Sequence, residues 1–156
     1  AFTLSVCQLC PESRGDIRLA SPDPFAHPAI RPNYLSTDLD RRTAVDSLKL
    51  TRRLVETKTL APYVAEEMRP GSDAQTDDEL LEGARRIAQT IYHPVGTCKM
   101  GRDPNAVVDD RLRVRGIRGL RVADASIMPT ITSGNTNAPA IMIGEKASDM
   151  IIEDNR

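Results

Sequence analysis

Residues 129–151 read PTITSGNTNAPAIMIGEKASDMI and contain the sharpest change of character in the chain. Small and polar residues, Gly134 to Asn137, are followed by an apolar run with helical spacing. The apolar positions are Ala140, Ile143, Ala147, Met150 and Ile151, which share one helix face. Pro139 is tolerated in the first turn of a helix. The pattern predicts a helix over about 138–153 with a polar N-terminus.

The polar residues before this helix allow two interpretations. A helix N-terminus presents free N–H groups and a partial positive charge, so it can hold an anion or a group that becomes anionic. Asn135 and Asn137 could instead be plain N-caps, since asparagine is a preferred capping residue. Spacing alone favours the capping interpretation.

A second informative stretch, residues 92–101, reads YHPVGTCKMG and follows a predicted helix. Residues 76–79, TDDE, have the form of a capping box. Leu80, Ala84, Ile87 and Ile91 then recur with helical spacing. Pro94 disfavours the α conformation at His93, so we expect the helix to end at about Tyr92. His93 is therefore predicted to be an extended residue at the exit of this helix.

The rest of the chain suggests a mixture of helices and short strands. The proline-rich tract 21–35 predicts an ordered, extended loop, in which His27 is a loop histidine. Capping candidates near residue 37 precede a helical pattern. The predicted elements are strands over 2–10, 14–20, 112–114 and 120–122, and helices over 38–57 and 61–68.

Composition excludes several classes of protein. The 156 residues carry a net charge of −1, which gives no general attraction to nucleic acid or membranes. Five arginines between 111 and 121 could suggest a polyanion face, but no aromatic residues are interleaved with them. The chain starts at Ala1 without a signal-peptide pattern. We expect the interior of a longer, cytoplasmic polypeptide.

The three cysteines and two histidines offer little further chemistry. Cys7 and Cys10 have the C-x-x-C spacing but no second pair, so we expect small buried or half-buried thiols in a reducing compartment. Cys98 follows His93 by five positions, yet no motif supplies an orienting group or oxyanion hole for a nucleophile. Distant histidines and unclustered carboxylates predict no metal site.

Several motifs together carry a resemblance that covers nearly the whole chain. They are YHPVGTCKMG (92–101), PESRGDIRLASPDP (11–24), IRPNYL (30–35) and VVDDRLRVRGIRGLRVADASIMPTITSGNTNAPAIMIGEKASDMI (107–151). The sequence resembles the C-terminal part of the glucose–methanol–choline (GMC) flavoprotein oxidoreductases, most of all the choline dehydrogenase branch. One departure is Cys10, where a basic residue is expected.

The resemblance implies an α+β fold with two parts. Residues 1–115 would form the substrate-binding domain, an antiparallel sheet flanked by helices. Residues 116–156 would form a C-terminal strand–helix segment that completes the FAD-binding domain. No G-x-G-x-x-G turn occurs in these residues, so the main N-terminal FAD domain, a partner of this part, would lie outside them.

The resemblance also implies an activity and two catalytic residues. The family oxidises an alcohol by moving a hydride from carbon to flavin N5 and a proton to a base. His93, in the HPVGT motif, resembles that base, and histidine titrates near neutrality. Asn135 resembles the second catalytic position, where an amide donates to the substrate oxygen. Asn137 is its rival for this role.

Cofactor-binding residues follow from the same resemblance. Asn137, Ala138 and Pro139 would shape the helix N-terminus against the flavin pyrimidine ring, where reduction leaves negative charge. Asp124 and Ala125, in RVADAS, resemble the flavin-contacting turn at a strand end. A plain turn or capping role for Asp124 stays open.

Three functional hypotheses remain at this stage. The first is an FAD-dependent alcohol dehydrogenase or oxidase, present here as its C-terminal portion. The second is a lyase of the same fold in which the flavin is redox-silent. The third is a non-catalytic domain, and we expect this chain by itself to oxidise no alcohol. The identity of the alcohol and of the electron acceptor is not encoded in any motif.

Overall fold

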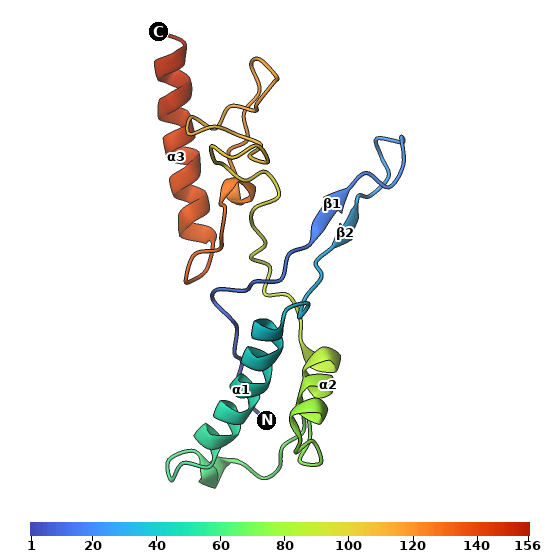
Figure 1. Cartoon of the computed structure of the whole chain (residues 1–156). Helices are drawn as coiled ribbons and strands as arrows, with labels where there is room; N and C mark the ends of the chain where they lie inside the picture. Colours follow the sequence, from blue (N-terminus) through green and yellow to red (C-terminus); the bar gives the residue numbers. More distant parts are fainter. The chain divides into compact units, whose positions relative to one another are not determined.

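The computed structural model describes all 156 residues, which form two compact units, 1–90 and 91–156. The first unit contains strands β1 (Asp16–Arg18) and β2 (Ala29–Arg31) and helices α1 (Asp38–Val55), η1 (Ala61–Tyr63) and α2 (Asp77–Ile87). The second contains the short helix η2 (Ala125–Ile127) and the long helix α3 (Asn137–Asp154). Figure 1 labels the main elements along the chain. No helix is both long and apolar enough to cross a bilayer.

Helices α1 and α2 pack on each other, and both start at a threonine N-cap. The hydroxyl of Thr76 accepts a hydrogen bond from the Glu79 N–H, and the Glu79 carboxylate accepts one from the Thr76 N–H. The predicted capping box is therefore confirmed. Val45, Ala74 and Leu80 form the small core of this unit, which holds the two helices together through apolar burial.

Helix α2 ends earlier than the sequence predicted. Its last residue is Ile87, and Ala88 already has an extended conformation with ψ 142°. Ile91 is 53% exposed, so the apolar packing that stabilises most protein helices is missing beyond Ile87. His93 is consequently not a helix-exit residue, because a non-helical segment, 88–92, separates it from α2.

Charged side chains hold the loops of the first unit. The Asp40 carboxylate accepts hydrogen bonds from the Glu12 and Ser13 N–H groups at 3.0 and 2.8 Å. Burial raises the pKa of Asp40, but these bonds and one from the Ser13 side chain lower it to a net value below the ordinary one. Arg52 makes two hydrogen bonds to Glu67 and donates to the Gly71 and Ala74 carbonyls.

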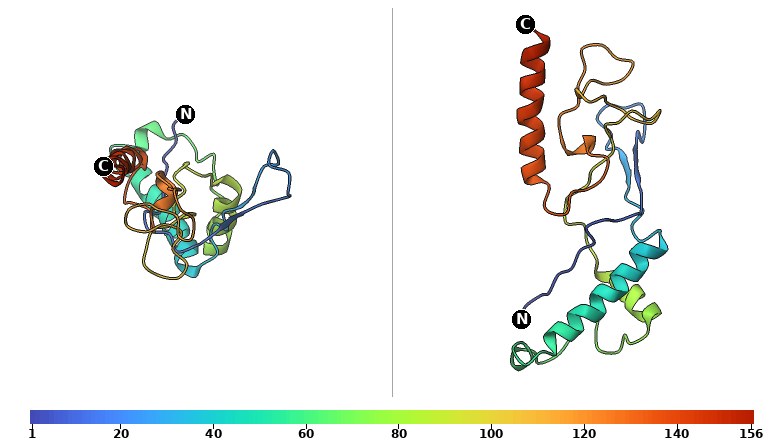
Figure 2. Two further views of the ribbon diagram at one scale, coloured as in Figure 1. Left: turned by 90° about the horizontal axis from the view of Figure 1, so that it is seen from above. Right: turned by 60° about the vertical axis from the view of Figure 1, so that its left-hand side comes forward.

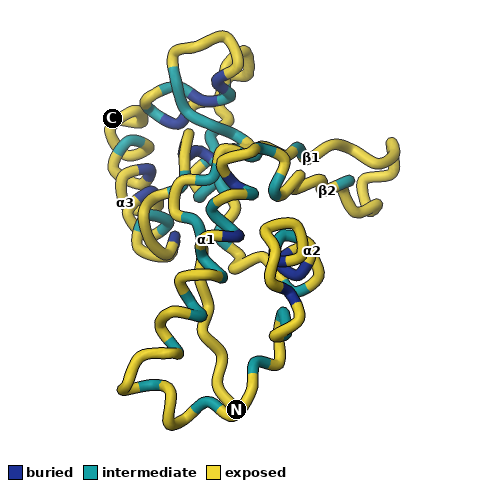
Figure 3. The backbone as a smooth tube through the Cα atoms, turned by 60° about the horizontal axis from the view of Figure 1, so that its bottom comes forward, coloured by how far each residue is buried: buried dark blue, intermediate teal, exposed yellow.

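The sheet is smaller than expected. β1 and β2 form a two-stranded antiparallel hairpin with Ile17 opposite Ile30. Residues 2–10 form no strand, since no neighbouring segment pairs with them, and they are almost all exposed (Figure 3). The loop prediction for 21–35 holds except at β2, whose three residues lie between Pro28 and Pro32. The helix predicted over 61–68 is only the single turn η1.

Two other expectations also need correction. Cys7 and Cys10 are exposed, because they lie on the unpaired N-terminal segment, and only Cys98 is half-buried. The strands predicted at 112–114 and 120–122 are reduced to isolated bridges, Val108 with Val114 and Arg113 with Arg121. A boundary between residues 115 and 116 in the parent protein stays a prediction, whereas the compact units of this chain meet at 90 and 91.

The core of the second unit lies between α3 and the irregular segments that precede it (Figure 2). Its buried members are Val108, Leu112, Ile127, Met128, Ile143 and Ala147. Ile143 and Ala147 come from the apolar face predicted for residues 138–153, and α3 starts one residue earlier and ends one residue later than that prediction. Apolar burial therefore holds α3 along its length against the loops.

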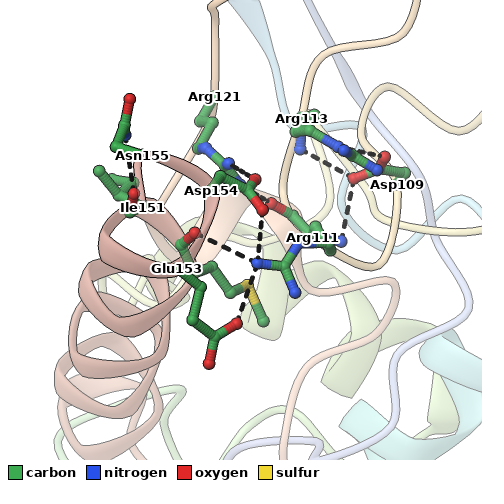
Figure 4. Close-up of polar contacts among 9 residues, drawn as sticks. Asp109, Arg111, Arg113, Arg121, Ile151, Glu153, Asp154 and Asn155 are labelled. Atoms are coloured by element: carbon green, nitrogen blue, oxygen red, sulfur yellow. Dashed lines mark hydrogen bonds and ion pairs between the residues drawn. The ribbon is translucent and has the colours of Figure 1, made fainter.

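A cluster of ion pairs holds the C-terminal end of α3 (Figure 4). Arg111 pairs with Glu153 and Asp154 at 3.1 and 2.8 Å, and Arg121 pairs with Asp154. The hydrogen bond from Arg121, reinforced by Arg111, lowers the pKa of Asp154 below its ordinary value, although burial opposes the shift. Arg111 and Arg121 belong to the run of five arginines between 111 and 121. In the structure they bind acidic residues of this chain.

Gly83 allows us to test the packing of α2. A Cβ built at this position lies 2.6 Å from Cβ of Pro70, and the proline ring cannot swing away. Glycine to alanine in a helix normally stabilises by about 0.5–1 kcal/mol. The overpacking should outweigh this gain, so we expect Gly83→Ala to destabilise the chain by about 1–2 kcal/mol in chemical denaturation.

The matched control is Gly144→Ala in α3, where a Cβ meets no atom within 4 Å. This substitution should stabilise the chain by up to about 1 kcal/mol through helix propensity alone. Equal stabilisation by both alanines would contradict the close contact between Gly83 and Pro70.

Asp154 provides a pH-dependent test of the ion pairs. Because its folded pKa is lowered, it stabilises the folded state above its unfolded pKa, and this contribution is lost as the pH falls through the folded value. Asp154→Asn should therefore be less stable than wild type near neutral pH. The difference should shrink below about pH 4, as the wild-type carboxylate becomes protonated. Urea denaturation across this range measures the effect.

Asp149→Asn is the control for this experiment. Asp149 lies on the same helix but makes only an exposed pair with Lys146 at 3.5 Å, and such pairs contribute little. A loss of stability of the same size in both variants would show that the cluster around Asp154 is not the cause.

Candidate active site

The segment that carries His93 is held beside η2 by backbone hydrogen bonds. The Cys98 N–H donates to the Ser126 carbonyl at 3.0 Å, and the Met100 N–H donates to the Ile127 carbonyl at 2.7 Å. Gly96 allows the close approach: its φ is +89°, and an added Cβ would lie 3.3 Å from the Met128 carbonyl oxygen. Only glycine adopts this conformation without strain. The HPVGT motif thus lies against residues 126–128.

Asp124 and Ala125 lie at the start of η2. The Asp124 carboxylate caps this turn by accepting a hydrogen bond from the Ser126 N–H at 2.7 Å. Asp124 is exposed and Ala125 is half-buried. The capping role that the sequence left open is therefore present, and the exposure of Asp124 leaves its second oxygen available to a ligand.

The N-terminus of α3 meets His93 through one hydrogen bond. The Thr136 hydroxyl lies 2.9 Å from Nδ1 of His93. Thr136 is 8% exposed, and His93 is half-buried. This contact brings the two sequence motifs together, because Asn135 and Asn137 flank Thr136 in the chain. Pro94 restricts the backbone that follows His93.

The start of α3 is left without a side-chain cap. Thr136 is its N-cap residue but makes no capping hydrogen bond, and the first turn contains no acidic residue. Asn135, Asn137 and Ala138 are exposed, and Pro139 is half-buried. The N–H groups of Asn137 and Ala138 precede the first intrahelical hydrogen bond, from Ala140 to Thr136. They remain available to an acceptor with developing negative charge.

Thr136 is the one site residue that the sequence interpretation missed. Its hydroxyl contacts His93, yet sequence analysis assigned it no role of its own. A signal was available in Pro139, which is the third residue of α3 and has no N–H to offer a threonine N-cap. Cys98 is bound to the site through its backbone N–H, and its half-buried thiol makes no hydrogen bond to a base that could activate it.

Known proteins resemble this chain over a range that includes the site residues. The sequence profile of the GMC oxidoreductases matches residues 11–144. An alcohol dehydrogenase [acceptor] of Pseudomonas putida is 48% identical over 97% of this chain. An oxygen-dependent choline dehydrogenase of Cronobacter sakazakii is 49% identical over 96% of it. In both cases the chain spans 27% of the relative's length.

A solved structure supports the same relationship. The FAD-dependent oxidoreductase from Chaetomium thermophilum superimposes with a TM-score of 0.86 and 27% identity, over 95% of this chain and 26% of that one. The profile match covers most of the chain, and the relatives share nearly half of their residues with it over that length. The chain therefore belongs to the GMC oxidoreductase family, whose C-terminal part it matches.

Proposed function

We propose that this chain is the C-terminal part of an FAD-dependent enzyme that oxidises the CH–OH group of an alcohol, with His93 as the base. The names of the relatives, alcohol dehydrogenase and choline dehydrogenase, support this reaction class. The FAD-dependent structural neighbour supports the cofactor. Because the chain spans only 27% of these relatives, the activity belongs to the parent protein.

The observation that carries the proposal is the hydrogen bond between His93 and Thr136. It holds a half-buried imidazole beside a helix N-terminus that has no cap and no acidic residue in its first turn. A base must stand in a restricted position to act on a bound substrate. A purely structural histidine would not require the neighbouring helix end to stay uncapped.

The residues present fit FAD at two places. The free N–H groups of Asn137 and Ala138 can donate to an acceptor whose negative charge increases, and Pro139 fixes the turn that presents them. When bound, FAD supplies the hydride acceptor at flavin N5. Asp124 offers an exposed carboxylate oxygen, and Ala125 a small neighbour, to the same cofactor at the start of η2.

His93 and Asn135 would both act on the substrate hydroxyl, in different roles. The His93 imidazole accepts the hydroxyl proton as the alcohol is oxidised. The Asn135 amide donates a hydrogen bond to the substrate oxygen as that oxygen gains negative charge. Asn137 remains its rival in this role, since both amides are exposed on either side of Thr136.

The main FAD-binding half of the parent protein is the partner that this proposal requires. Residues 1–115 would contribute the substrate-binding domain, and 116–156 would complete the FAD-binding domain. The G-x-G-x-x-G turn that holds a dinucleotide pyrophosphate is not among these 156 residues. The chain with added FAD should accordingly oxidise no alcohol.

The decisive experiment replaces His93 in the full-length parent protein. His93→Ala should slow anaerobic flavin reduction by about 10²–10⁴-fold, the usual contribution of a general base. Choline and benzyl alcohol are the probe substrates, one cationic and one neutral. Stopped-flow absorbance of the flavin measures the rate.

His27→Ala is the control, since His27 is the other histidine of the chain and lies exposed in the proline-rich loop. It should reduce its flavin at the wild-type rate. Equal rates for His93→Ala and wild type would exclude His93 as the base. A flavin that stays oxidised with both alcohols in the wild type would favour the redox-silent lyase instead.

A further inference from the structure

The three long helices of the chain all start after a threonine, but the third threonine behaves differently. Thr37 and Thr76 are extended, with ψ 157° and 159°, and each hydroxyl accepts a hydrogen bond at 3.3 Å from the N–H of the third helical residue. Thr136 has ψ 0° and makes no such bond. Its hydroxyl lies against His93 instead.

The sequence explains this difference. The third residue of α1 is Asp40 and that of α2 is Glu79, and both have a backbone N–H. The third residue of α3 is Pro139, which has none. The donor that caps α1 and α2, the N–H of the third helical residue, is therefore missing at α3. A buried hydroxyl needs a hydrogen-bonding partner, and Nδ1 of His93 is the partner of Thr136.

We propose that Thr136 is a positioning residue that accepts a hydrogen bond from Nδ1–H of His93 and thereby keeps Nε2 unprotonated for the proton of the alcohol. The inference rests on the proposed function, and it adds a residue to that reaction. The hydrogen bond made by one imidazole nitrogen determines which tautomer is present. With Nδ1 directed at Thr136, only Nε2 can reach a substrate.

The opposite tautomer would not serve the reaction. If Thr136 donated to Nδ1, the proton of neutral His93 would lie on Nε2, which then could accept nothing. With the hydroxyl as acceptor, the O–H bond of the alcohol breaks and an N–H bond forms at Nε2; bound FAD would supply the acceptor for the hydride of the carbinol carbon. The bond from Nδ1–H to Thr136 is kept throughout, and it strengthens when the ring becomes charged.

The test uses three variants of the full-length flavoprotein. Thr136→Val keeps the shape of the side chain without its hydroxyl, Thr136→Ala removes the hydroxyl without adding bulk, and Thr136→Ser restores it. We expect valine and alanine to slow flavin reduction at saturating choline or benzyl alcohol by about 10- to 100-fold, the range typical of losing a hydrogen bond that orients a metal-bound histidine. Serine should stay within about threefold of wild type.

A double-mutant cycle separates positioning from structure. If Thr136 acts through His93, then Thr136→Val should cause no further loss in a His93→Ala background. Thr76→Val is the structural control: it removes a true N-cap, so it should lower the melting temperature without slowing flavin reduction. Thr136→Val should slow flavin reduction without lowering the melting temperature.

Three outcomes would overturn the inference. They are a wild-type rate in both hydroxyl-free variants, a loss in Thr136→Ser as large as in Thr136→Val, or an undiminished effect of Thr136→Val when His93 is absent. Failure of the proposed function is distinguishable, because there His93→Ala itself would leave flavin reduction unchanged. If His93→Ala slows reduction and the Thr136 variants do not, only the role of Thr136 is wrong.

Discussion

Two backbone hydrogen bonds, from Cys98 to Ser126 and from Met100 to Ile127, determine the arrangement of the second unit. They place the HPVGT segment along η2 and bury Ile127, which is 1% exposed, in the core beneath α3. Backbone groups taken out of water must find partners, so this pairing restricts the path of the chain on both sides of it. The position of His93 depends on that path.

At the start of α3, by contrast, a missing hydrogen-bond donor leaves backbone groups unpaired. Pro139 has no N–H, so Thr136 lacks the third-residue donor that caps α1 and α2, and the start of α3 has no side-chain cap. Ion pairs of Arg111 and Arg121 and the apolar face of α3 hold the rest of that helix. A helix secured along its length can therefore present an uncapped N-terminus, as an anion-stabilising site requires.

The first unit is held together by a different balance of forces. Its largest core cluster has three buried apolar residues, Val45, Ala74 and Leu80. Asp40 and Arg52 compensate by binding the backbone of loops that lie far from them in sequence. Charged side chains with several backbone partners make strong hydrogen bonds, so removal of either side chain would release a loop, and removal of Arg52 would also break its ion pair with Glu67.

The sequence by itself determined the features that depend on neighbouring residues. The capping box at Thr76 and the start of the helix near Asn137 were predicted correctly, and so was its apolar face except for Ile151, which is exposed. Each of these features rests on contacts between residues three or four positions apart. Family motifs in the sequence also indicated His93 and the residues around Asn135 as the candidate site. Those assignments rest on motif order and spacing, which survive without coordinates.

Only the tertiary structure decided the features that depend on distant partners. Helix α2 ends at Ile87, after which Ala88 is extended and Ile91 is exposed, and residues 2–10 form no strand because no segment pairs with them. The contact between Thr136 and His93 joins residues that are 43 positions apart. A hydroxyl in the sequence does not reveal its acceptor or donor, since that partner is chosen by how the chain folds back on itself.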